Sequence, residues 1–144
     1  MEGTPLFCPL RRRWVKPTPE EQIRQKLVAA MIEKGGYPLS LLAAELPLAQ
    51  LSEGKVPRRR LDLVCFVQAK EGGVEPFLLI ECKAVALGER ALRQLLGYNY
   101  FLKAPYVALA NGEELLFGEW KEEKLSYSRR AELPSFEALR SLNS

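Results

Sequence analysis

Hydrophobic residues recur at helical spacing in two segments of the chain. After Thr18, apolar positions return every three or four residues until a glycine pair, which predicts a helix over about residues 18–34. Thr18 is a suitable N-cap, and Glu21 three positions later completes a capping box. A second periodic segment covers residues 88–103 and stops before a proline. The pattern therefore predicts two amphipathic helices.

Short, continuously apolar runs separated by turn residues predict strands that are covered on both faces. The expected strands cover residues 39–46, 61–68, 77–84, 106–110 and 115–120. Asn111-Gly112 is a strong hairpin signal between the last two strands, and residues 134–142 are expected to form a short closing helix. This order of elements predicts a mixed α/β layer architecture.

The first seventeen residues are punctuated by prolines and rich in arginine. We expect residues 1–17 to form a basic N-terminal arm and residues 18–144 to form a single domain. The arm also carries apolar residues with which it can pack on the domain: Leu6, Phe7, Trp14 and Val15.

Composition is that of an ordinary globular protein, with 47% hydrophobic and 27% charged residues in 144. No apolar run approaches the roughly 18 residues of a membrane-spanning helix, and the first residues do not resemble a secretory signal. The cysteine count is odd, at three, which predicts reduced and buried thiols. We therefore expect a cytoplasmic protein without a membrane partner.

The chain contains no histidine. This excludes Ser–His and Cys–His nucleophiles, histidine-ligated zinc and histidine general bases. Catalysis would have to use carboxylates, lysine, tyrosine, cysteine, or a hard metal ion held by oxygen atoms.

Positive charge is modest overall but is clustered in two places. The formal net charge is +3, and arginine triplets occur at residues 11–13 and 58–60. Such triplets can bind phosphate, and they can equally be solvated surface groups.

Three charged residues interrupt the apolar strands at residues 61–68 and 77–84: Asp62, Glu81 and Lys83. In an antiparallel hairpin the start of one strand lies beside the end of the next, so Asp62 is expected near Glu81. Charges beside a core are unfavourable unless they are paired or bind a metal ion. Two carboxylates with an adjacent lysine suit Mg²⁺ and a phosphate substrate.

The Glu-x-Lys spacing alone is not specific, because it also occurs at Glu53/Lys55, Glu119/Lys121 and Glu122/Lys124. Only Glu81-x-Lys83 follows a four-residue apolar run and an Asp-bearing strand. The competing interpretation is a salt bridge at the end of a strand.

Two further features are compatible with a site. Glu20 lies three positions before Ile23, on the expected inward stripe of the first helix, although an acid is also favourable in a first turn. Gln94 and Tyr98 are four apart and share a helix face, where they can hydrogen-bond a carboxylate, a lysine or a phosphate. Taken alone, Tyr98 is more typical of a core residue than of a site residue.

Together these residues resemble the N-terminal nuclease domain of type I restriction enzyme R subunits, in its short stand-alone branch, within the PD-(D/E)xK nuclease superfamily. The resemblance covers about residues 17–120 and rests on these motifs: Pro19-Glu20-Glu21-x-x-Arg24-Gln25, Arg60-x-Asp62, Glu81-Cys82-Lys83-Ala84, Gln94-x-x-x-Tyr98-Asn99 and Asn111-Gly112.

The resemblance implies a restriction-endonuclease-like central mixed sheet of about five strands flanked by helices. It implies that Asp62, Glu81 and the Cys82 backbone carbonyl bind Mg²⁺ or Mn²⁺, and that Lys83 activates the attacking water.

The resemblance further implies that Glu20 is an accessory acid and that Gln94 and Tyr98 support the site or touch DNA. The implied partners are DNA and a homodimer or larger restriction-type complex. The chain has no G-x-x-x-x-G-K-[S/T] loop, so no ATP-driven motor is expected in it.

Three hypotheses follow. In the first, the protein is a Mg²⁺-dependent DNA endonuclease whose Arg58, Arg59 and Arg60 hold the DNA backbone. In the second, it is a DNA-binding or assembly module that keeps the fold with weak or absent catalysis. In the third, it is a structural domain whose ion pairs are coincidental.

Overall fold

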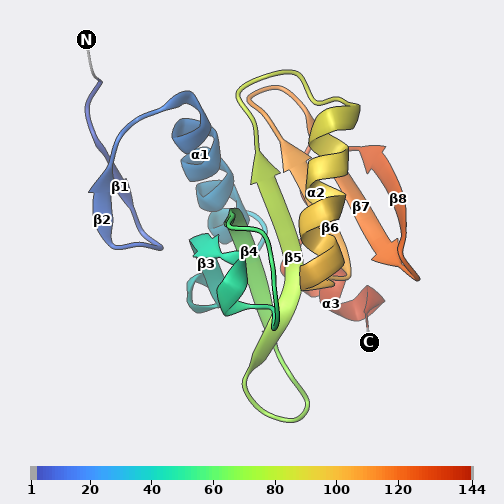
Figure 1. The fold of residues 1–144 in the computed structure, drawn as a ribbon. Coiled ribbons are helices and arrows are strands. Elements are labelled where there is room, and N and C mark those ends of the chain that lie inside the picture. Colours follow the sequence, from blue (N-terminus) through green and yellow to red (C-terminus); the bar gives the residue numbers. More distant parts are fainter. Residues whose placement is uncertain (1–2, 144) are drawn as a thin grey trace.

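A six-stranded mixed sheet forms the centre of the structure, a computed structural model that describes residues 3–143 (Figure 1). Its strands lie in chain order: β3 (Leu42–Pro47), β4 (Arg60–Gln68), β5 (Val74–Cys82), β6 (Tyr106–Ala110), β7 (Leu115–Lys121) and β8 (Lys124–Arg129). Neighbouring strands are antiparallel except β5 and β6, which are parallel and are connected by a helix. The predicted mixed α/β class is confirmed.

Helices cover both faces of the sheet (Figure 1). Helices α1 (Pro19–Glu33) and α3 (Phe136–Leu142) pack on one face, and their residues Val28, Met31 and Leu139 join the core there. Helix α2 (Glu89–Leu102) packs on the other face through Leu95 and Leu102. Short 3₁₀ turns η1 (Leu39–Leu41) and η2 (Leu48–Gln50) flank β3. The central strands are therefore buried on both sides, as their continuous apolar runs predict.

The N-terminal arm contains a two-stranded hairpin that the sequence pattern did not predict. Strand β1 (Leu6–Cys8) pairs antiparallel with β2 (Arg13–Val15), separately from the main sheet. Cys8 is buried, whereas Phe7 and Trp14 face each other across the two strands and are exposed.

The structure differs from the predicted strands in two places. The expected strand at residues 39–46 begins as the η1 turn and becomes β3 only at Leu42. Strand β8 was not predicted, because its hairpin has no Asn-Gly or Asp-Gly signal. Glu122 and Glu123 instead adopt positive φ angles of 53° and 63° in the turn between β7 and β8.

Asn99 fastens the end of α2 to the start of β6. Its side chain is fully buried, accepts a hydrogen bond from the Ala104 N–H and donates to the Ala104 carbonyl, both at 3.0 Å. Both bonds satisfy backbone groups of Ala104, which is buried directly after the C-cap residue Lys103. Within the motif Gln94-x-x-x-Tyr98-Asn99, Asn99 therefore has a structural role.

The three thiols and the helices agree with the sequence-based expectations. Cys8, Cys65 and Cys82 are buried and free of disulfides, as predicted. Within residues 3–143, no helix combines the length and apolar character needed to cross a bilayer.

Candidate functional site

The predicted carboxylates meet where β4 and β5 begin to separate. The last pair in the register at this end is Leu63 with Ile80, and one position further Asp62 lies opposite Glu81. There the carboxylates bind the backbone of the facing strand. The Asp62 N–H donates to Glu81 Oε2 at 2.9 Å, and the Cys82 N–H donates to Asp62 Oδ2 at 2.7 Å. Each carboxylate is thus held in place by a backbone N–H that donates to one of its two oxygens.

Burial makes this pair electrostatically unfavourable on its own. Glu81 is only 4% exposed, and burial together with the Asp62 charge raises its pKa to about 8, against opposing effects of the Asp62 N–H and Lys83. Burial also raises the pKa of Asp62, although the Cys82 N–H and Arg24 act against it. A positive charge placed between the two carboxylates would relieve this repulsion.

Lys83 and Gln94 lie beside the carboxylates. Lys83 directly follows β5, and its N–H donates to the Ala110 carbonyl on β6 at 2.8 Å. Its ammonium donates a short hydrogen bond to Gln94 Oε1 on α2. The Lys83 charge lowers the pKa of both Asp62 and Glu81. The structure therefore brings together Asp62, Glu81, Lys83 and Gln94 at one end of the sheet.

Tyr98 lies one turn after Gln94 on α2 and connects the site to the arginine triplet. It is half-buried against the α2-side core. Burial raises the pKa of its phenol, the Glu81 charge adds to this, and a hydrogen bond with Arg59 opposes it. Tyr98 is thus both a packing residue and a neighbour of the carboxylates.

The predicted DNA-backbone residues Arg58, Arg59 and Arg60 are exposed where the chain enters β4. Arg60 Nη1 donates to the Glu45 carbonyl at 3.1 Å. In the other triplet, Arg11 is engaged in an ion pair with Glu21 at 2.6 Å, so it is not a free phosphate ligand in this structure.

The prediction that Glu20, and not Glu21, faces inward at the start of α1 is wrong. Glu20, expected on the inward stripe, is exposed, whereas Glu21 is 5% exposed. Thr18 Oγ1 does accept the Glu21 N–H at 3.1 Å, but the Thr18 N–H donates to Lys16, so only half of the capping box forms. The Glu20 charge still contributes to the raised pKa of Cys82, after burial, Asp62 and Glu81.

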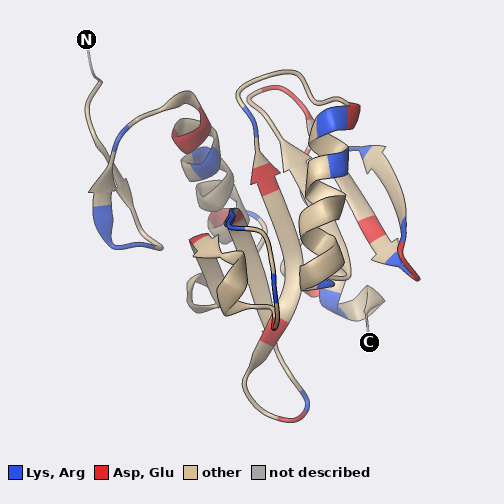
Figure 2. Cartoon of the chain, viewed as in Figure 1, with Lys and Arg blue, Asp and Glu red and all other residues tan. Residues whose placement is uncertain are grey.

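The Glu21 carboxylate is the centre of a buried ionic network instead of a cap. It accepts hydrogen bonds from Arg11 and Arg24, both at 2.6 Å, and from Gln25 at 2.7 Å. Burial alone would raise the pKa of Glu21, but these bonds lower it to about 2. Figure 2 shows acidic positions in the first turns of α1 and at the end of β5.

Arg24 and Glu45 belong to the site, but sequence reasoning gave neither a role, and only Arg24 lies in one of the quoted motifs. Arg24 Nη1 lies 2.8 Å from Glu45 Oε1 and 3.6 Å from Asp62 Oδ1, and it donates to the Asp62 carbonyl at 3.3 Å. The i,i+3 spacing of Glu21 and Arg24, within the first motif of the resemblance, is a signal for this network. Nothing in the sequence marks Glu45, which adopts a left-handed φ of 56° opposite Asp62 in the register of β3 and β4.

The donor set fits a hard cation only in part. Among residues 3–143, no three His, Cys, Asp or Glu side chains are arranged to hold a metal ion. Asp62 and Glu81 nevertheless offer two convergent carboxylates, and Cys82 follows Glu81 at the same strand end. Two carboxylates completed by water and phosphate oxygens are a common Mg²⁺ environment, so the residues are compatible with Mg²⁺.

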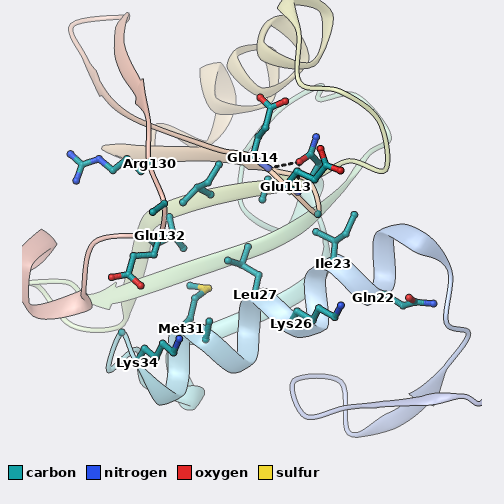
Figure 3. A pocket seen from close by; sticks show the side chains of 18 of the residues that line it. Gln22, Ile23, Lys26, Leu27, Met31, Lys34, Glu113, Glu114, Arg130 and Glu132 are labelled. Atoms are coloured by element: carbon teal, nitrogen blue, oxygen red, sulfur yellow. Dashed lines mark hydrogen bonds between the residues drawn. The ribbon is translucent and has the colours of Figure 1, made fainter.

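A large groove lies elsewhere on the described part of the chain. It has a volume of about 810 Å³ and lies between α1 and residues 130–135 (Figure 3). Ile23, Leu27 and Met31 of α1 point toward it, and charged side chains such as Lys26 and Glu132 lie around it. None of the predicted site residues lines this groove, so it is distinct from the carboxylate pair.

Comparison with models of protein families gives a match to the chain. The family model described as the type I restriction enzyme R protein N terminus matches residues 19–134. No curated protein and no solved structure matches the chain.

Proposed function

Because the chain belongs to the family of the type I restriction enzyme R protein N terminus, we propose that it hydrolyses DNA phosphodiester bonds at the Asp62–Glu81 pair in a Mg²⁺-dependent reaction. The observation that carries the proposal is the pair itself. Two carboxylates are fixed by reciprocal backbone hydrogen bonds at 2.9 Å and 2.7 Å, and burial together with the Asp62 charge raises the pKa of Glu81 to about 8. Groups with pKa values this far from normal are typical of functional sites.

Asp62, Glu81 and the Cys82 carbonyl would hold the metal ion, and Mn²⁺ is an expected substitute. When bound, Mg²⁺ supplies Lewis-acid polarisation of the phosphate and charge neutralisation at the leaving oxygen. The set Asp62 and Glu81-x-Lys83 conforms to the PD-(D/E)xK pattern, to which we assign this site.

Side chains around the metal site would orient the water, stabilise charge on the phosphate and contact the DNA. Lys83, positioned by Gln94, would orient the attacking water and stabilise negative charge that grows on the phosphate. Tyr98 would hold Arg59 near the site, and Arg58 and Arg60 would contact the DNA backbone without reading sequence. Glu20, exposed beside this end of the sheet, remains the candidate accessory acid. The proposed assembly is a homodimer or a restriction-type complex.

A DNA-binding module without catalysis is the second candidate, and one observation favours it. The Arg24 guanidinium lies 3.6 Å from Asp62 Oδ1, so part of the negative charge is already balanced without a metal ion. That arrangement would allow the fold to persist with a site that binds DNA but does not cut it.

A plasmid-nicking assay distinguishes the nuclease from the non-catalytic DNA-binding module. We expect wild-type protein to nick supercoiled plasmid in Mg²⁺ or Mn²⁺ and Asp62→Asn to be about 100-fold slower or worse, as for loss of a transition-state contact. Glu53→Gln, an exposed acid in the loop before β4, is the matched control and should keep wild-type activity. DNA binding that weakens steeply with salt, with no cleavage in any metal ion, would establish the binding module instead.

A further inference from the structure

We propose that the outer face of the β1–β2 hairpin is a stacking surface for unpaired bases of DNA, an inference that rests on the proposed DNA-directed function and specifies its substrate. The hairpin presents two large aromatic side chains outward. Phe7 is 50% exposed and Trp14 is 67% exposed. They lie opposite each other in the register, with ring centroids 5.4 Å apart and an angle of 72° between the rings.

These aromatic residues lie on the exposed side of the hairpin and are not its buried contact. The opposite side of the hairpin supplies that contact, through buried Cys8 and half-buried Leu6 and Val15. An edge-to-face pair uses the face of only one ring, which leaves other ring faces open to a ligand. Two large aromatic side chains exposed side by side on a small hairpin are therefore typical of a binding surface.

Charge identifies the kind of ligand. Residues 3–17 include Arg11, Arg12, Arg13 and Lys16 and no acidic residue. Arg12, Arg13 and Lys16 are exposed. Cations beside open aromatic rings are the combination that single-stranded nucleic acids bind, because phosphates meet the charges and bases stack on the rings. A fully paired duplex hides its base faces and can use only the charges.

The hairpin is fixed close to the carboxylate pair. Arg11, in the turn between β1 and β2, binds Glu21 at 2.6 Å, Glu21 binds Arg24, and Arg24 lies 3.6 Å from Asp62. Figure 1 shows the hairpin beside α1. An unpaired strand held on the hairpin would thus lie near the proposed cleavage site, which favours DNA with single-stranded segments as substrate.

Binding measurements without metal ion test this inference apart from catalysis. With the full chain in EDTA, we expect Trp14→Ala to weaken binding of a short oligo(dT) by about 10-fold, the effect of losing one stacked base. Trp14→Phe should retain most of the affinity, and binding of a blunt-ended duplex should be unchanged. Tyr127→Ala is the matched control, because Tyr127 is 53% exposed on β8 at the far edge of the sheet.

Fluorescence gives a second readout. In a Trp120→Phe background, where Trp14 is the single tryptophan, oligo(dT) should quench the emission and duplex should not. Equal oligo(dT) affinities of Trp14→Ala and Tyr127→Ala would overturn the inference. The inference would also be overturned if Trp14→Ala lost affinity for oligo(dT) and duplex equally. A Trp14-dependent dimer with unchanged DNA affinity would overturn it too.

Catalytic variants separate this inference from the proposed function. Asp62→Asn should bind oligo(dT) like wild type while it loses cleavage. Normal oligo(dT) binding in a protein that never cleaves would contradict the proposed nuclease but support the stacking surface. Cleavage with no contribution of Trp14 to oligo(dT) binding would support the proposed nuclease and contradict the stacking surface.

Discussion

Glu81→Gln is expected to increase the stability of the folded protein at and above neutral pH while it reduces DNA cleavage by about 100-fold or more. Glutamine keeps an oxygen that can accept the Asp62 N–H, but it removes a carboxylate that burial and Asp62 disfavour. The variant should therefore gain on the order of 2 kcal/mol in free energy of unfolding near pH 8. A gain in stability with a loss of activity is the signature of a site kept for function.

The pH dependence of protein stability follows from the same Glu81 carboxyl group. Glu81 binds its proton more tightly in the folded protein, with a pKa of about 8, than in the unfolded chain, where the value is near 4.5. Wild-type stability should therefore contain a component that falls as pH rises between these values, and Glu81→Gln should lack it. Urea unfolding across this range measures it, with Glu75→Gln, an exposed acid on the same strand, as control. Parallel pH profiles for wild type and Glu81→Gln would refute the assignment.

Arg24→Met is expected to cause the largest loss of stability, about 3–5 kcal/mol, because it leaves the buried Glu21 carboxylate with one cation fewer. It also removes the partner of Glu45 and the positive charge beside Asp62. Lys26→Met is the matched control, since Lys26 is an exposed cation on the same helix. Chemical denaturation of both variants near pH 7 measures the difference.

The acid limb of the stability profile gives an independent check on this network. The pKa of Glu21 is lowered to about 2 from an ordinary 4.5, so its contribution is complete above the ordinary value and is lost as pH falls toward 2. Arg24→Met should weaken that acid dependence. A loss below about 1 kcal/mol, the size of a surface pair, would show that the network is not a major source of stability.

The fold and the carboxylate pair could be predicted because both follow from local periodicity. Continuous apolar runs indicate buried strands, and Asp62 and Glu81 are the acids that interrupt two consecutive runs. Once these runs form an antiparallel pair, the two acids must lie at the same end of it. The helix limits were similarly accessible, with α1 at Pro19–Glu33 and α2 at Glu89–Leu102.

The remaining features depend on tertiary contacts that the sequence does not encode locally. Glu20 and Glu21 are adjacent in a first turn, where either acid is favourable, and only the positions of Arg11 and Arg24 decide that Glu21 is buried. Glu45 joins the site through a left-handed backbone conformation that is unusual for glutamate. Strand β8 was missed for a related reason, because two glutamates form its turn where glycine or asparagine is the usual signal.

The most direct test of the central claim compares two lysines that share the same local spacing. Lys83 follows Glu81 at the proposed site, and Lys121 follows Glu119 by the same spacing at the end of β7. In a plasmid-nicking assay with Mg²⁺, Lys83→Ala should lose about 100-fold or more of the rate, while Lys121→Ala should nick like wild type. Equal nicking by wild type and Lys83→Ala would contradict a catalytic site at Asp62, Glu81 and Lys83.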